Sequence, residues 1–184
     1  MSKERPSATE QQTTSTIQHP QVNDLPGSLM GSQEISNWIL IGTLLVAVIA
    51  LWRNHVINRR AATINMVIHQ KNDSRYTTAR ETFKTLQEEE NVAKYADKTQ
   101  LESDIRDAIL TILNQYEFVA SGINEGAFCK GLYKRLQYGV VTKDYDKLEG
   151  FISELRRANK HPTLFQEFET LAKRFKKKPL KKRG

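Results

Sequence analysis

The longest apolar run in the chain covers residues 35–52, ISNWILIGTLLVAVIALW, and contains no charged side chain. Ten of its eighteen residues are Leu, Ile or Val, and these favour membrane insertion by about 3–6 kcal/mol in total. A helix of this length rises about 27 Å, close to the hydrocarbon thickness of a bilayer. The run is apolar on every face, unlike a surface helix of a soluble domain. The pattern predicts a transmembrane helix over 35–52, with Trp38 and Trp52 at its membrane interfaces.

A cleaved signal peptide is the other kind of segment that carries such a run. Its apolar part is about 7–15 residues long and follows closely behind a basic start. Here the run begins only after Glu34, and no Lys or Arg lies between Pro6 and Glu34. We therefore expect the segment to remain in the protein as an anchor.

The helix is expected to continue past the membrane, because no Gly or Pro occurs between Arg53 and His69. Within this predicted juxtamembrane helix, 53–72, apolar residues recur at spacings of four, three and four, which is one helical stripe. The stripe consists of Ile57, Ala61, Ile64 and Ile68. We expect it to pack on the chain's own domain, and a second copy of the helix is the alternative partner.

Residues 73–175 show helical periodicity throughout and no sustained alternation of period two. Asp73 or Ser74 is expected to cap the first helix, Gly122 and Gly139 to end two later ones, and Pro162 to start the last. The apolar stripes are Tyr76/Ala79/Phe83/Leu86, the run from Leu101 to Ala120, Phe128/Leu132/Leu136, Leu148/Phe151/Ile152/Leu155, and the run from Leu164 to Phe175. The predicted fold is all-α: one N-terminal transmembrane helix continuing into a small cytoplasmic helical bundle of five or six helices.

The charges beside the span predict its orientation. Arg53, Arg59 and Arg60 follow it closely, and the twenty residues before it contain no Lys or Arg. Basic residues stay on the cytoplasmic side of a membrane, so we expect the N-terminus outside and the C-terminal body inside. Residues 1–34 carry a net charge of −2 and residues 53–184 a net charge of +9. The first segment is rich in Ser, Thr, Gln and Pro, which predicts a disordered extracytoplasmic tail.

The C-terminal end is strongly basic, and we assign residues 176–184 to a polybasic tail. Eight of the eleven residues from 173 to 183 are basic: Lys173, Arg174, Lys176, Lys177, Lys178, Lys181, Lys182 and Arg183. Such a cluster close to a bilayer is expected to bind anionic lipid headgroups. Nucleic acid is the less favoured partner, because no aromatic platform or nucleic-acid-binding motif accompanies the charge.

Glu117 is the one acidic residue that we single out, since it lies between two aromatic residues near a buried helix face. A partly buried carboxylate needs a partner, so we expect a structural ion pair with Arg80, Arg135 or Arg156. A general acid or base is the alternative, without a second group to support it.

Other chemistry finds little support in the sequence. The four His residues make no metal-ligand spacing with each other or with the single cysteine, Cys129. No phosphate-binding Gly loop or nucleophile elbow is present. Asp144 and Asp146, beside Lys143 and Lys147, fit a solvated helix start. We therefore expect neither an enzyme nor a bound metal or cofactor.

Three motifs stand out within residues 112–174: Tyr116-Glu117-Phe118, a turn containing Gly122, Ile123 and Gly126, and a closing pattern of Phe168, Leu171, Ala172 and Arg174. By these motifs the segment resembles a family of uncharacterised bacterial single-pass membrane proteins. The resemblance implies a cytoplasmic helical domain of unknown function in the bacterial inner membrane, with no catalytic residues. It also implies a link to phage exclusion or defence.

These observations favour a membrane-anchored helical protein that binds another, unidentified protein at the inner leaflet, in phage exclusion or in a stress response. The alternative is a membrane-tethered protein that binds nucleic acid through its basic tail. Thr43, Ala47 and Ala50 lie on one stripe of the span, and small residues aligned in this way allow close helix approach. A homo-oligomer is therefore a further expectation.

Overall fold

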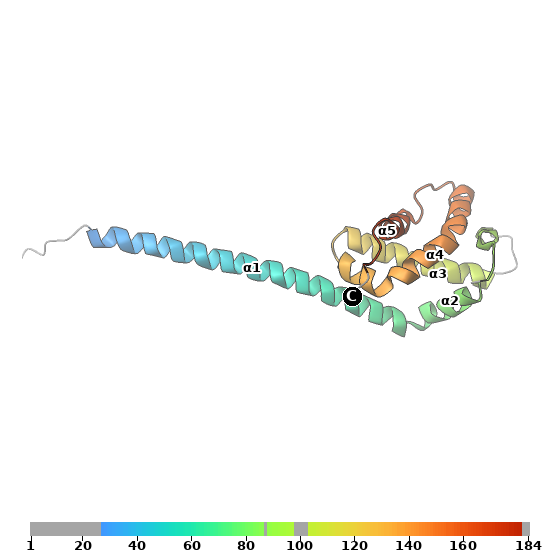
Figure 1. Cartoon of the computed structure of the whole chain (residues 1–184), viewed down its shortest axis with the longest axis horizontal. Coiled ribbons are helices and arrows are strands. Elements are labelled where there is room, and N and C mark those ends of the chain that lie inside the picture. Colours follow the sequence, from blue (N-terminus) through green and yellow to red (C-terminus); the bar gives the residue numbers. More distant parts are fainter. Residues whose placement is uncertain (1–26, 87, 98–102, 182–184) are drawn as a thin grey trace, which may run out of the picture. The chain divides into compact units, whose positions relative to one another are not determined.

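A computed structural model describes residues 27–86, 88–97 and 103–181, with side chains described from Glu34 onward (Figure 1). The chain divides into two compact units, one ending at Val46 and the other beginning at Ala47. All regular structure in the described residues is helical. The predicted all-α class is therefore confirmed, whereas residues 1–26 of the predicted N-terminal tail lie outside the described part.

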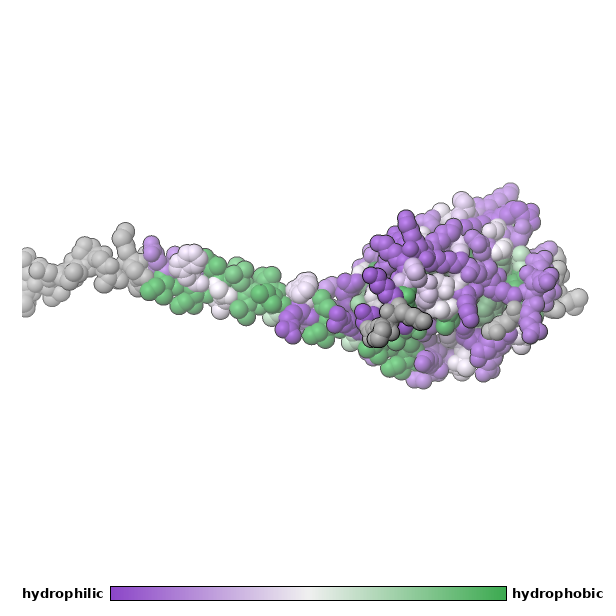
Figure 2. Space-filling view, viewed as in Figure 1, coloured by the Kyte–Doolittle hydropathy of each residue, from purple (hydrophilic) through white to green (hydrophobic). Residues whose placement is uncertain are grey.

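The first helix, α1, covers Gly27–Asn72 and belongs to both units. It begins before the predicted start at Ile35, so the end of the expected disordered tail is helical instead. Every side chain described in the first unit is exposed, including Trp38 and Leu40, and the space-filling view shows this part as a mainly hydrophobic surface (Figure 2). Among the described residues, α1 alone is long and apolar enough to cross a membrane, and none of its most apolar window is buried.

The second unit continues α1 and adds α2 (Ser74–Thr85), the short 3-10 helix η1 (Val92–Ala96), α3 (Ser103–Asn124), α4 (Lys130–Asn159) and α5 (Gln166–Lys177). α3 packs against α2 and α5, and α4 packs against η1 and α5. The centre of α3 is fully buried at Ile109, Ile112 and Leu113. Aromatic residues complete the core, with the Phe168 ring of α5 stacked on Tyr116 at a centroid distance of 4.5 Å.

Local sequence signals explain where several helices begin and end. Asp73 caps α2 as predicted, because its carboxylate accepts hydrogen bonds from the backbone N–H groups of Arg75, at 2.9 Å, and Tyr76, at 3.3 Å. α3 continues through Gly122, where a break was expected. A Cβ atom at this position would lie 2.5 Å from the Phe128 ring, so glycine here permits close packing rather than ending the helix.

The prediction of two helices around Gly139 is wrong, since α4 is one helix over Lys130–Asn159. Gly139 lies on an exposed part of α4, where a glycine costs only about 1 kcal/mol relative to alanine. The expected stripe through Leu136 is also wrong. Leu136 is 48% exposed, whereas Tyr133 is 1% exposed and begins the buried face that continues through Val141.

The last helix begins later than predicted. Residues 162–165, including Pro162, form turns, and α5 starts at Gln166. Lys160 and Phe165 both adopt left-handed backbone conformations, with φ of 53° and 59°. These two residues reverse the chain direction between α4 and α5. Pro162 alone had predicted a helix start and not this reversal.

The apolar stripe of α1 does not pack on the domain as expected. Ile57, Ile64 and Ile68 are 56%, 45% and 50% exposed. The domain instead covers the opposite face of α1, where Thr63 is 0% and Val67 is 8% exposed. A threonine whose hydroxyl is fully hydrogen-bonded can occupy a buried site. The more apolar stripe of α1 therefore need not be the side that faces the domain.

Candidate functional site

Thr63 and Arg59 join α1 to the segment that precedes α4. The Thr63 hydroxyl donates to the Arg59 carbonyl at 2.7 Å and accepts the backbone N–H of Cys129 at 2.8 Å. The Arg59 guanidinium donates to the Phe128 carbonyl at 3.0 Å. Arg59, predicted as a membrane-interface residue, therefore has a role within the second unit.

The other predicted interface residues have open surroundings. Arg53, Arg60, Trp38 and Trp52 are all exposed. Exposed arginines and indoles are free to contact lipid headgroups. The structure thus leaves these four side chains available for the predicted contact.

Glu117 does not form the expected ion pair. Its carboxylate accepts hydrogen bonds from the backbone N–H groups of Glu167, at 3.2 Å, and Phe168, at 2.8 Å. These amides belong to the first turn of α5, whose N–H groups have no partner within the helix. Phe165, at the N-cap position of α5, provides no side-chain hydrogen bond. Glu117 of α3 therefore caps α5 and holds the two helices together.

Two of the three arginines considered as partners of Glu117 bind other carboxylates, and the third, Arg135, is exposed. Arg156 contacts Glu169 at 2.7 Å, and Arg80 is paired with Asp144. Both pairs join different helices, α4 with α5 and α2 with α4.

Asp144 is the centre of a polar cluster that the sequence reasoning missed. It is 8% exposed, and its carboxylate accepts hydrogen bonds from the Arg80 guanidinium and, at 2.6 Å, from the Tyr116 hydroxyl. These residues come from α2, α3 and α4. Because each polar group is satisfied by another, the cluster is arranged to bind three helices together.

The surroundings of this cluster shift the pKa values of its members. Burial, followed by the negative charge of Asp144, raises the pKa of Tyr116 well above its usual value. Burial disfavours the charged form of Arg80, but the Tyr116 and Asp144 oxygens more than offset this and raise the pKa of Arg80. At neutral pH the cluster therefore contains a protonated tyrosine and a charged arginine.

The signal that identifies Asp144 is its helical register. Val141, Asp144, Leu148 and Leu155 lie at spacings of three, four and seven, so they share one face. Asp144 is predicted to be a core residue only when α4 is treated as one continuous helix. The expected helix start at Asp144 and Asp146 concealed it.

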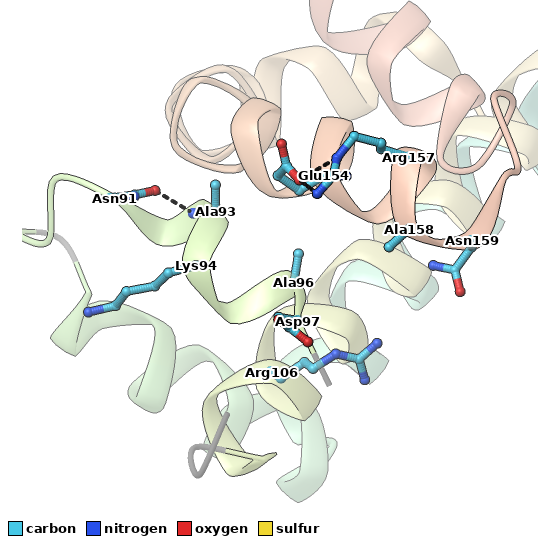
Figure 3. Close-up of a pocket in the computed structure, with 10 residues that line it drawn as sticks. All are labelled: Asn91, Ala93, Lys94, Ala96, Asp97, Arg106, Glu154, Arg157, Ala158 and Asn159. Atoms are coloured by element: carbon cyan, nitrogen blue, oxygen red, sulfur yellow. Dashed lines mark hydrogen bonds and ion pairs between the residues drawn. The ribbon is translucent and has the colours of Figure 1, made fainter. Parts of the chain in front are cut away.

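A groove of about 640 Å³ lies between η1 and the C-terminal half of α4 (Figure 3). Seven of the ten lining side chains are polar or charged, unlike the largely apolar lining of most small-molecule sites. The lining residues are Asn91, Ala93, Lys94, Ala96, Asp97, Arg106, Glu154, Arg157, Ala158 and Asn159.

Two of the cations in this groove already have acidic partners. Lys94 pairs with Glu89 at 3.1 Å, and Arg157 pairs with Glu154 at 2.8 Å. Arg106 differs, because its Nε atom is buried and has no hydrogen-bond partner. Arg106 therefore carries a buried donor without a partner.

The basic C-terminal residues divide into two groups. The first makes internal contacts: Lys173 with Glu169 at 2.5 Å, Arg174 with the Asn124 amide oxygen at 3.0 Å, and Lys176 with Asp146. The second group has exposed side chains and consists of Lys177, Lys178 and Lys181. Lys182 and Arg183 lie outside the described residues. The predicted tail also begins inside α5, which continues to Lys177.

No group of three or more His, Cys, Asp or Glu side chains in the described part of the chain is placed to hold a metal ion. Cys129 is half-buried and unpaired. It precedes α4 and contributes its backbone N–H, rather than its thiol, to the contact with Thr63.

Comparison with known proteins places these features in a family. No curated protein and no solved structure shows detectable similarity to the chain. Residues 37–175 match the family described as Domain of unknown function (DUF4760). The match includes the apolar part of α1 from Asn37, the predicted juxtamembrane segment 53–72 and the helical domain to Phe175. The chain therefore belongs to the DUF4760 family.

Proposed function

We propose that this chain is a single-span protein of the bacterial inner membrane, with its N-terminus outside and its helical domain in the cytoplasm. The exposed apolar surface of α1 supports insertion, since so many exposed apolar side chains are unfavourable in water. The arginines that follow the span support the orientation. The predicted bacterial location rests on the family resemblance.

The domain binds a protein partner through the groove between η1 and α4. The observation that carries this proposal is the buried, unpartnered Nε of Arg106 in a mainly polar groove. A buried donor without a partner is costly, and a side-chain movement that brings this donor to an acceptor of a binding partner would remove the cost. Arginine is also enriched in protein interfaces, where its planar fork binds carboxylates and carbonyls. A polar or acidic segment of a partner fits this lining.

Binding rather than catalysis is the activity that the described side chains support. The Arg80–Asp144–Tyr116 cluster is satisfied internally, and Glu117 is used as a helix cap. The resemblance to phage-associated membrane proteins supports a role in phage exclusion or in a stress response. In such a role the anchor holds the binding domain close to the inner leaflet.

Photocrosslinking in living cells tests this proposal. A photoreactive phenylalanine analogue at Ala158, in the groove, is expected to capture a discrete protein adduct. The matched control is Ser153, which is also exposed on α4 but lies on another face. Arg106→Gln should weaken the adduct at position 158. Equal adducts at both positions, or an adduct insensitive to Arg106→Gln, would contradict the proposal.

Binding of nucleic acid is the second candidate, favoured by the exposed side chains of Lys177, Lys178 and Lys181. Phosphate backbones and anionic headgroups attract the same cations. We favour anionic lipid over nucleic acid as the ligand of these lysines, because the proposed anchor keeps them close to a membrane surface. A variant of the three lysines, described in the Discussion, distinguishes the two ligands.

A further inference from the structure

The exposed stripe of α1 extends further than the four residues of the predicted juxtamembrane stripe. Within the second unit, exposed residues recur at alternating spacings of three and four from Ala47 to Ile68. Written as a heptad, position a holds Ala47, Asn54, Ala61 and Ile68, and position d holds Ala50, Ile57 and Ile64. A period of 3.5 residues is the pattern by which two helices remain in contact along a left-handed supercoil.

We propose that this stripe, the heptad face, is the surface on which two copies of the chain pair as parallel helices. The domain does not compete for it, because Thr63 and Val67, which the domain buries, lie at positions c and g. Gln70 and Arg59, both half-buried, lie at positions c and f. The domain thus packs mainly on positions c and f, reaches position g at Val67, and leaves positions a and d exposed along the whole stripe.

Lipid does not account for two of the exposed isoleucines, Ile64 and Ile68. Ile68 lies sixteen residues beyond Trp52, the end of the predicted span, and this corresponds to about 24 Å along the helix axis. The headgroup layer of each leaflet is only about 5–8 Å thick. Ile64 and Ile68 therefore lie outside the bilayer when the helix continues along the membrane normal, where a second helix can cover them.

Asn54 favours an identical partner in register. It occupies an a position and is exposed. A single asparagine at such a position in a coiled coil selects the alignment in which it meets the same residue of the other helix. An amide carries both donors and an acceptor, so two copies of Asn54 can hydrogen-bond to each other.

The flanking charges favour the parallel arrangement. Arg53 and Arg60 lie at g positions, and Asn58 and Asn65 lie at e positions. In a parallel pair each g residue faces the e residue of the next heptad, so Arg53 meets Asn58 of the second copy and Arg60 meets Asn65. In an antiparallel pair g faces g, and arginine would meet arginine. Insertion of every copy with the same topology also imposes the parallel arrangement.

The two ends of the heptad face suit two different environments. Ala47 and Ala50, in the predicted span, allow the close helix approach by which membrane helices associate. Ile64 and Ile68, farther beyond the span, provide the apolar area that drives association in water. The heptad face therefore supplies contacts suited to lipid at one end and to water at the other.

Oxidative crosslinking of the full chain in native membranes tests the proposal. In a Cys129→Ser background, single cysteines replace Ile57, Ala61 or Ile64 on the heptad face. His55→Cys and His69→Cys, exposed at b positions of the same helix, are the matched controls. Since a disulfide requires Cα atoms within about 7 Å, the heptad-face variants should give at least about tenfold more crosslinked dimer than the controls. Equal yields, higher yields at the controls, or no dimer would overturn the proposal.

Two further measurements separate pairing from misfolding. Adding Ile57→Glu and Ile64→Glu to the Ala61→Cys chain should abolish the crosslink, whereas adding His55→Glu and His69→Glu should leave it. Thermal unfolding of each purified variant, in excess detergent at a dilution where the parent chain is monomeric, should match that of the parent chain. A marked loss of stability from the glutamates would show that the stripe is buried within one protomer, which would also overturn the proposal.

Discussion

Two faces of α1 differ in composition and in surroundings between Ala47 and Ile68. The face on the domain is held by Arg59 and by a fully buried threonine, Thr63. The other face carries three isoleucines that are about half exposed. This reverses the usual arrangement of an amphipathic helix, in which the apolar side faces the protein's own core. The comparison shows that a helical spacing of apolar residues predicts where a helix lies. It does not identify which molecule covers the apolar side of that helix.

The largest effect is expected in the polar cluster of the second unit, where burial of polar groups also holds helices together. Asp144→Ala leaves Arg80 and the Tyr116 hydroxyl without their acceptor. It should lower the free energy of unfolding by about 3 kcal/mol, because breaking one partner of a buried pair leaves an uncompensated charge. Urea unfolding of the detergent-solubilised chain measures this effect.

Asp146→Ala provides the matched control, two residues away on the same helix. The Asp146 side chain is 58% exposed and pairs with Lys176 at the surface. Its loss should change the free energy of unfolding by less than about 1 kcal/mol. Equal effects at the two positions would mean that the cluster does not hold the helices together.

The two faces of α1 are compared most directly by substituting the neighbours Thr63 and Ile64. Thr63→Val leaves the Cys129 N–H without an acceptor and should lower the free energy of unfolding by about 1–3 kcal/mol. Ile64→Ser, on the exposed face, should change it by less than about 0.5 kcal/mol in a monomer. Urea unfolding in excess detergent measures both. A greater loss at Ile64 would reverse the assignment of the faces.

The basic residues at the C-terminal end provide a comparison of the same kind. Replacing the exposed Lys177, Lys178 and Lys181 by glutamine should weaken binding to anionic liposomes by about 1 kcal/mol per lysine at low salt. The variant Lys173→Gln/Lys176→Gln, in which internally paired lysines are removed, should lose less per residue. Vesicle flotation, with duplex DNA in a parallel assay, measures both ligands. Loss of DNA binding alone would favour the nucleic-acid alternative.

The smallest effect is expected at Glu169, which pairs with Lys173 and Arg156. The hydrogen bond from Lys173 lowers the pKa of Glu169 below its usual value of 4.5, and the contacts with Arg156 lower it more. Partial burial opposes this shift but does not cancel it. The folded state therefore binds this proton less readily than the unfolded state. The stabilisation is present above pH 4.5 and is lost as the pH falls through the lower folded pKa.

Glu169→Gln tests this pH dependence. The variant should be less stable than the parent by less than about 1 kcal/mol at pH 7. The difference should disappear at acidic pH, once the parent carboxylate is protonated. Urea unfolding over a pH series follows the difference, and a gap that widened on acidification would contradict the assignment.

The features that the sequence predicts well are those governed by neighbouring residues. The cap at Asp73 and the buried face of α3 through Ile112 and Tyr116 depend on local spacing, and the structure contains both. A helix that continues through Gly139 depends on tertiary packing, which offsets the weak propensity of one exposed glycine. That misjudged boundary also concealed Asp144, because its core register depends on a continuous α4.

The partners of polar groups were harder to predict for a related reason. Glu117 was expected to pair with an arginine, but its carboxylate oxygens accept hydrogen bonds from backbone amides of α5. Arg106 gave no signal in the sequence, since its role depends on how η1 and α4 enclose it. Spacing along one helix cannot show which second helix approaches.

Everything proposed here depends on α1 crossing the membrane with the N-terminus outside. Cysteine labelling in intact cells measures this directly. In a Cys129→Ser background, a cysteine at Ser15 and a cysteine at Lys143 are compared with a membrane-impermeant maleimide. The account predicts that the Ser15→Cys chain is labelled in intact cells and the Lys143→Cys chain only after lysis. Labelling of Lys143→Cys in intact cells, or protection of both until lysis, would contradict it.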